Sequence, residues 1–169
     1  MERSNGGVMP PARFLRIVAL VVVVDAFTKS LAVEALTPAY TPHPVWGDWM
    51  RLTLVYNPGA AFGLYLGAYS RWIFMALTLL ALVVMWRLYR QSARDAAWRS
   101  WALALVSGGA LGNLVDRIRS PRGVVDFLDV GVGAWRWPTF NVADMAVSTG
   151  AVILAVVLWN EDAEQARTP

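Results

Sequence analysis

A run of apolar residues at positions 14–33 reads FLRIVALVVVVDAFTKSLAV. A helix of roughly 20 mostly apolar residues is long enough to cross the hydrocarbon core of a bilayer. Three later runs, at about 72–89, 101–115 and 142–159, have the same character. The four runs predict four transmembrane helices, and we expect residues 1–169 to form one integral membrane domain.

The composition agrees with a membrane protein. Apolar residues make up 57% of the 169 residues, and the mean hydropathy is +0.44. Cysteine is absent, and His43 is the only histidine. The chain therefore lacks the cysteines for a thiolate site and the several histidines for a multi-histidine zinc site. A histidine-based serine triad could use only His43. We expect no metal and no cofactor, and we interpret His43, between two prolines, as a solvated loop residue.

Two polar segments, 34–70 and 116–140, separate the apolar runs. Prolines in the first exclude a continuous helix. Within it, 51–56 alternates polar and apolar residues, which is typical of a β-strand. The turn residues Asn57-Pro58-Gly59 follow, and a second apolar stretch lies at 62–66. This pattern predicts a small hairpin-like sheet at the membrane surface.

Arginines around the runs predict the orientation of the chain. The connection at 87–100 is rich in arginine, and Arg13 and Arg16 lie at the entrance to the first run. Cytoplasmic connections carry an excess of Arg and Lys. We therefore predict cytoplasmic termini and place 34–70 and 116–140 outside the cytoplasm. The net charge of +3 does not come from a basic face with interleaved aromatics, so we expect no nucleic-acid partner.

Charged residues interrupt the first apolar run. Ionisable groups at membrane depth are costly, which makes each a candidate for function. Asp25 and Lys29 lie four residues apart, hence on one helix face, where they form an ion pair, orient a site, or do both. They also break the apolar core that a cleavable signal peptide would need, which argues against that alternative for 14–33.

A second polar group closes the third run. Asn113, Asp116 and Arg117 are spaced three and four residues apart, so they share one face of a helix. A cluster at the membrane interface explains them without any catalytic role, because interfaces tolerate charge. The spacing alone leaves both interpretations open.

Two acids near the fourth run are the main catalytic candidates. Asp126 lies among apolar neighbours, with Asp129 close behind it, and Asp144 follows Asn141 with the spacing of a helix capping box. When two carboxylates meet, repulsion raises one pKa, so one stays protonated while the other is ionised. The ionised group can activate water, and the protonated one can donate to an amide carbonyl. Spacing decides neither between Asp126 and Asp129 nor which acid holds the proton.

Five motifs resemble, in order, those of the bacterial lipoprotein signal peptidases, or signal peptidase II. They are D-x-x-T-K at 25–29, N-x-G-A-A-F within 57–63, G-A-x-G-N-x-x-D-R within 108–117, V-x-D-F at 124–127 and F-N-x-A-D at 140–144. The resemblance implies a fold of four transmembrane helices with a small extracytoplasmic β-cradle, and Asp126 and Asp144 as the catalytic pair. It also implies supporting roles near the site for Asp25, Lys29, Asn57, Gly108, Asn113, Arg117 and Asn141.

The same resemblance implies a substrate and a location. The substrate would be a prolipoprotein whose lipobox cysteine carries diacylglycerol, cut just before that cysteine. The site would lie at the outer interface of the bacterial cytoplasmic membrane, in contact with lipid. We expect the enzyme to act as a monomer.

The residues by themselves also allow other functions. A small transporter or ion-pathway protein is the main alternative, because Asp25, Lys29, Asp116 and Arg117 could form a charged path. The lack of an internal repeat and the position of the acids near one interface argue against it. A non-enzymatic scaffold is a third hypothesis. A Ser/Lys peptidase is weaker, since Lys29 and the adjacent Ser30 point in different directions on a helix.

Overall fold

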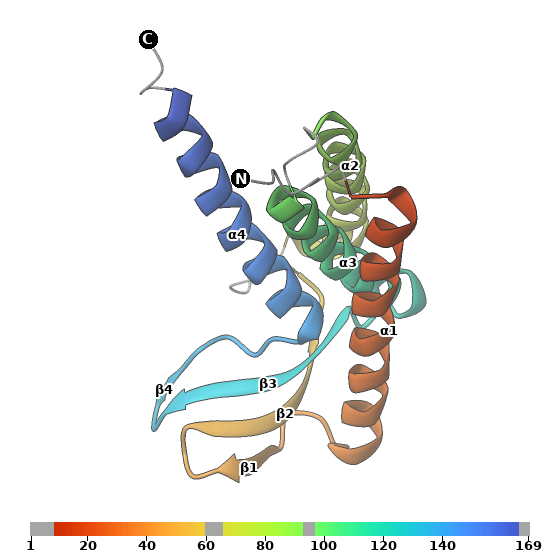
Figure 1. Ribbon diagram of the computed structural model, residues 1–169. Coiled ribbons are helices and arrows are strands. Elements are labelled where there is room, and N and C mark those ends of the chain that lie inside the picture. Colours follow the sequence, from red (N-terminus) through yellow and green to blue (C-terminus); the bar gives the residue numbers. More distant parts are fainter. Residues whose placement is uncertain (1–8, 60–65, 93–96, 166–169) are drawn as a thin grey trace.

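The computed structural model describes residues 9–59, 66–92 and 97–165, which form four α-helices and a four-stranded antiparallel sheet. The elements are α1 (Pro11–Ala35), β1 (Pro42–Trp46), β2 (Met50–Asn57), the short 3-10 helix η2 (Gly67–Tyr69), α2 (Ser70–Gln91), α3 (Ala97–Arg119), β3 (Val124–Val132), β4 (Trp135–Arg136) and α4 (Val142–Gln165). The sheet lies at one end of the helices, and the start of α1, the end of α2 and the end of α4 lie at the other (Figure 1).

Each of the four predicted apolar runs lies within one of these helices, so the prediction of four helices is confirmed. Two segments of the described chain are long and apolar enough, by length and composition, to cross a membrane. They are Gly67–Gln91, which includes α2, and Val142–Glu161, in α4. α1 fails that test because it carries charged residues in mid-helix, and α3 because it is rich in small and polar residues.

The charges of α1 nevertheless point inward. Asp25 and Lys29 are 1% and 3% exposed, whereas Val23 and Phe27 on the outer face are 64% and 62% exposed. A soluble protein would arrange these residues the other way round. An apolar exterior around a charged interior is the arrangement expected of a helix that faces lipid.

α3 is the central helix and packs against α1, α2 and α4. Its glycines allow the neighbouring helices to approach closely. A Cβ atom added at Gly108 would lie 2.7 Å from the Val21 Cβ of α1, and one added at Gly109 would lie 2.2 Å from the Ala143 carbonyl oxygen of α4. The glycines therefore set the distances at which α1 and α4 meet α3.

The sheet has the strand order β1-β2-β3-β4. The strand predicted at 51–56 is confirmed as part of β2, which pairs with β1 before it and with β3 from the distant segment 116–140. Of the second apolar stretch at 62–66, all but Leu66 lies outside the described residues. The pairing of β2 with β3 brings Val55 opposite Asp126 and attaches both polar segments to one surface.

The interpretation of His43 as a solvated loop residue is wrong. His43 lies in β1, is half-buried, and has a buried Nε2 atom with no hydrogen-bond partner among the described residues. Its neighbours Pro42 and Pro44 suggested a loop. Proline is tolerated in a strand at the edge of a sheet, where one side needs no backbone N–H donor, and β1 is such a strand.

We predict that Gly109→Ala lowers the thermal stability of the protein and its activity together. The added methyl would meet the Ala143 backbone, so α4 must move at the end that carries Asp144. Overpacking of this kind costs about 1–3 kcal/mol. Thermal unfolding in detergent measures the loss, with Ala110→Gly, one residue along α3, as the control that changes one methyl without a clash. Equal stability of Gly109→Ala and the wild type would contradict this account.

Candidate active site

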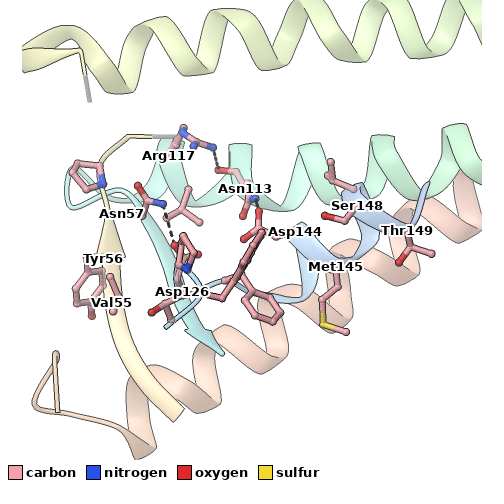
Figure 2. A pocket seen from close by; sticks show the side chains of 17 residues that line it. Val55, Tyr56, Asn57, Asn113, Arg117, Asp126, Asp144, Met145, Ser148 and Thr149 are labelled. Atoms are coloured by element: carbon pink, nitrogen blue, oxygen red, sulfur yellow. Dashed lines mark hydrogen bonds between the residues drawn. The ribbon is translucent and has the colours of Figure 1, made fainter. Parts of the chain in front are cut away.

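A cavity of about 680 Å³ lies where the sheet meets the start of α4. Its lining residues come from β2, α3, β3, α4 and the segment that precedes α4. Five of the predicted site residues line it, namely Asn57, Asn113, Arg117, Asp126 and Asp144 (Figure 2). Most of the remaining wall is apolar, so these polar groups face a cavity of low polarity.

Asp126 projects into this cavity from β3. Its side chain is 2% exposed, Oδ1 accepts an N–H from Asn141 Nδ2 at 2.7 Å, and Oδ2 accepts one from Asn57 Nδ2 at 3.1 Å. Burial and the nearby charge of Asp144 raise the pKa of Asp126 to about 7, although the two hydrogen bonds lower it. Asp126 therefore retains a proton at pH values where an ordinary aspartate is fully ionised.

Asp144 belongs to the first turn of α4. Its backbone N–H donates to Asn141 Oδ1 at 2.9 Å, and its Oδ2 accepts the backbone N–H of Asn141 at 3.2 Å, which confirms the predicted capping box. Its Oδ1 accepts a third hydrogen bond from Asn113 Nδ2 at 2.8 Å. Two N–H groups, one from the Asn141 backbone and one from the Asn113 side chain, therefore hold the Asp144 carboxyl group in position at the start of α4.

Asn141 connects the two aspartates. The side chain is fully buried, its amide nitrogen donates to Asp126 Oδ1, and its amide oxygen accepts from the Asp144 backbone. The same nitrogen lies 3.1 Å from Asn113 Oδ1. One asparagine thus fixes the separation between a strand carboxylate and a helix carboxylate.

Lys29 sets the orientation of Asn113. Its Nζ atom donates to Asn113 Oδ1 at 2.9 Å and forms ion pairs with Asp25 Oδ2 at 2.7 Å and Asp116 Oδ2 at 2.8 Å. A lysine ammonium can only donate, so the atom of Asn113 that faces it must be the oxygen. The Asn113 nitrogen then points to Asp144. Because this nitrogen can only donate, its partner must be an acceptor, and the Asp144 carboxylate oxygen is one.

Asp25 attaches α1 to the start of α4. Its Oδ1 accepts the backbone N–H of Ala143 at 2.9 Å, while its Oδ2 binds Lys29. Asp25 and Lys29 therefore form the ion pair that the first interpretation predicted, and both also contact residues next to Asp144.

Arg117 adds a positive charge to the wall of the cavity. Its Nη1 donates to the Asn113 carbonyl at 3.2 Å and its Nη2 to the Gly59 carbonyl at 2.9 Å. Asn57 Oδ1 in turn accepts the Gly59 N–H at 3.0 Å. These bonds connect α3 to the end of β2. Residues 60–63 of the motif that begins at Asn57 lie outside the described residues.

Three of the other candidates lie outside the cavity. Asp129 accepts a hydrogen bond from Thr53 Oγ1 at 2.9 Å and pairs with Arg136 at 2.7 Å, away from Asp126 and Asp144. Asp116 binds Lys29, and Gly108 packs against α1. Geometry thus separates Asp126 from Asp129, a choice that spacing left undecided and that the V-x-D-F motif had made in favour of Asp126.

Comparison with known proteins identifies the family. The model of the family described as signal peptidase (SPase) II matches residues 17–160. A lipoprotein signal peptidase of Burkholderia mallei (strain SAVP1) is 41% identical over 156 residues, which cover 91% of this chain and 90% of that protein. One from Cupriavidus taiwanensis is 40% identical over 160 residues, covering 92% and 88%. The chain belongs to the signal peptidase II family.

Two solved structures share the fold. Each is described as a bacterial membrane enzyme. The first has a TM-score of 0.85 at 24% identity and covers 97% of this chain and 98% of that one. The second has a TM-score of 0.79 at 25% identity, with 90% and 96% covered. These matches extend over the sheet as well as the helices.

Membership of the signal peptidase II family confirms the predicted family and the predicted enzyme class, an aspartic peptidase. It also decides between the peptidase and the alternatives of a transporter, a scaffold and a Ser/Lys peptidase. The two apolar helices and the likeness to a membrane enzyme agree with the predicted membrane location.

Some lining residues of the cavity escaped the sequence motifs. Thr139, Ser148 and Thr149 are examples. A signal for one of them was present, because Ser148 lies four residues after Asp144 and so on the same face of α4. Thr139 lies in an irregular segment, where no periodicity indicates direction.

We predict that the Asp126 carboxyl loses its proton as the pH rises through about 7. Infrared difference spectroscopy can follow the carboxyl stretch of the protonated acid. Because the charge of Asp144 is one of the causes that raise this pKa, Asp144→Asn should move the transition to lower pH. Asn57 lowers it, so Asn57→Leu should move the transition up.

Asp129→Asn is the matched control for this titration, because Asp129 lies on the same strand but pairs with Arg136. It should leave the transition in place. A transition that persists near pH 7 in Asp126→Asn would show that another group titrates there.

Proposed function

We propose that Asp126 and Asp144 are the catalytic carboxylates with which this member of the signal peptidase II family removes signal peptides from prolipoproteins. The observation that supports this most is their shared cavity, in which the buried Asn141 bridges one acid to the other. The different environments of the two acids give them different roles. Asp144 accepts N–H donors at a helix start, and Asp126 has its pKa raised to about 7.

The proposed reaction begins with Asp126 protonated and Asp144 ionised. Asp144 takes a proton from a water molecule as the water oxygen attacks the carbonyl carbon of the cleaved amide. Asp126 gives its proton to the carbonyl oxygen, which yields a neutral tetrahedral diol. Asp144 then passes its proton to the amide nitrogen as the C–N bond breaks, and Asp126 recovers one from a diol hydroxyl. A free carboxyl end and a free amine result.

The surrounding residues hold this pair in place. Lys29 fixes Asn113, Asn113 and Asn141 hold Asp144, and Asn57 holds Asp126. Arg117 offsets part of the negative charge that the cavity carries when both acids are ionised. A displacement of about 1 Å in such a constellation is enough to lower a rate by two orders of magnitude, which explains why so many buried polar groups surround two carboxylates.

The apolar cavity wall suits a lipid-bearing substrate. The apolar lining residues include Val55, Val124, Phe140 and Met145. Helix α2 packs against α3 but contributes no residue to the lining of the cavity. We propose that a prolipoprotein with a diacylglyceryl-modified cysteine enters sideways from the bilayer, with the cleaved bond just before that cysteine. All the groups needed come from one chain, so a monomer suffices.

We also propose that all four helices cross the cytoplasmic membrane of a bacterium. The inward charges of α1 and its apolar outer face support this for the helix that carries charged residues in its middle. Arginine at the end of α2 supports a cytoplasmic position for that end of the bundle. The termini would then lie in the cytoplasm, and the sheet and the cavity at the outer interface.

The test of the catalytic pair is to make Asp126→Asn and Asp144→Asn separately and measure cleavage of a diacylated prolipoprotein. Each variant should lose at least about 10³-fold in kcat, because each acid moves a proton in every step. Asp129→Asn, on the same strand and outside the cavity, is the control and should keep most of its activity. Cleavage at the wild-type rate by either Asn variant would refute the assignment.

The orientation can be tested because the chain has no cysteine. Single cysteines at Trp135, in the sheet, and at Arg90, at the end of α2, give one reporter for each side. A thiol reagent that cannot cross membranes should label Trp135→Cys in intact spheroplasts and Arg90→Cys only after lysis. The opposite pattern would reverse the proposed topology.

A further inference from the structure

Two hydroxyl groups line the cavity one helical turn beyond Asp144. Ser148 and Thr149 both belong to α4 and are exposed to the cavity, whereas the other α4 residues on its wall beyond Asp144, Met145 and Val147, are apolar (Figure 2). Four residues along a helix correspond to a rise of about 6 Å. The hydroxyls therefore form a polar patch next to the carboxylates and further along the helix.

These hydroxyls are available to bind a ligand. Thr28 in α1 and Thr78 in α2 donate to the carbonyl four residues earlier, Val24 at 2.9 Å and Phe74 at 2.7 Å. Across the described parts of the chain, Ser148 and Thr149 make no hydrogen bond through their side chains, and both face the cavity instead. The motifs that carry the family resemblance do not include either residue.

The substrate has groups that need such partners. A signal peptide in a bilayer satisfies its backbone groups by forming a helix. A peptidase needs the backbone beside the cleaved amide to be extended, so that water and two carboxylates reach the carbonyl. Unwinding that part of the helix exposes N–H and C=O groups to an apolar wall, which is unfavourable unless serine or threonine side chains or water satisfy them.

The direction of α4 tells which part of the substrate lies near the hydroxyls. The sheet lies at the Asp144 end of α4, and the helix runs away from it (Figure 1). The released lipoprotein continues outside the bilayer, hence on the side of the sheet. The residues that precede the cleaved bond must then run along α4 from Asp144 towards Ser148 and Thr149.

We propose that the hydroxyls of Ser148 and Thr149 bind the backbone of the unwound substrate segment that immediately precedes the cleaved bond. The site is specific for an extended peptide at membrane depth and needs no particular side chain. It rests on the proposed function of Asp126 and Asp144 and extends it to the binding of the signal peptide.

The first test compares Ser148→Ala/Thr149→Val with the wild type on a diacylated prolipoprotein. The double variant should lose about 10- to 100-fold in kcat/KM, since uncompensated backbone groups oppose binding in the extended form. Ser148→Thr keeps a hydroxyl and should keep most of the activity. Thr78→Val, which removes a hydroxyl bonded within α2 and outside the cavity, is the matched control and should cleave normally.

The second test asks whether the contact is with the backbone. Synthetic substrates carry an ester in place of one amide at each of the positions before the cleaved bond, which removes an N–H and weakens a carbonyl acceptor. Wild-type enzyme should lose activity with at least one ester, and the double variant should lose much less with that same substrate. Equal losses in both enzymes at every position, or wild-type kinetics of the double variant, would overturn the proposal.

These results can be separated from failure of the catalytic assignment. If Asp126 or Asp144 is not catalytic, Asp126→Asn or Asp144→Asn cleaves the all-amide substrate at the wild-type rate. If only the hydroxyl site is wrong, those variants are inactive while Ser148→Ala/Thr149→Val behaves as the wild type. Thermal unfolding of each variant in detergent is the check that the substitution leaves the fold intact.

Discussion

The buried ammonium group of Lys29 is the interaction on which the rest of the site depends. A charge among apolar helices must be compensated, and Lys29 uses its three N–H donors on Asp25, Asp116 and Asn113. The ammonium thereby connects α1 to α3, and Asp25 carries the connection on to the Ala143 backbone of α4. These contacts offset the free-energy cost of burying the cation, and they also fix the positions of α1, α3 and α4 relative to one another.

A chain of hydrogen bonds leads from the Lys29 ammonium group to the two carboxylates. Lys29 determines which end of the Asn113 amide faces Asp144, and Asn141 then relates Asp144 to Asp126. The two acids have the same chemistry but not the same surroundings. One caps a helix and accepts backbone and amide N–H groups, while the other is 2% exposed in a strand beside it. The burial of Asp126 and the charge of Asp144 beside it raise the pKa of Asp126, so the position of that acid in the fold sets its proton affinity.

The packing of α3 makes this closeness possible. A side chain at Gly112 would meet the Asp25 carboxylate at 2.6 Å, and one at Gly109 would meet the backbone of α4. Small residues at helix contacts are the usual means by which membrane helices approach one another. Here they serve a further purpose, because the helices that approach carry the polar groups of the site. Stability and chemistry therefore depend on the same few contacts.

The local features of this protein follow from its sequence alone. The four helices appear as apolar runs, and the capping box of Asn141 and Asp144 appears as a three-residue spacing. Each depends on residues a few positions apart, where helix geometry fixes the relation between side chains. The ordered motifs add the family, because they retain the same residues around the same helices.

Tertiary structure alone decided which elements meet at the cavity, and it gives the physical reason why Asp126, which the V-x-D-F motif had indicated, faces the cavity while Asp129 does not. Asp126 and Asp129 are three residues apart on one strand, so their side chains point to opposite faces, and a shift of one residue in the pairing of β2 with β3 would exchange them. That register is a contact between segments about 70 residues apart, and no local pattern specifies it. The edge-strand position of His43 and the exposure of Ser148 to the cavity have the same origin. Both depend on segments that are distant in sequence and packed nearby, and not on the residues that are adjacent in sequence.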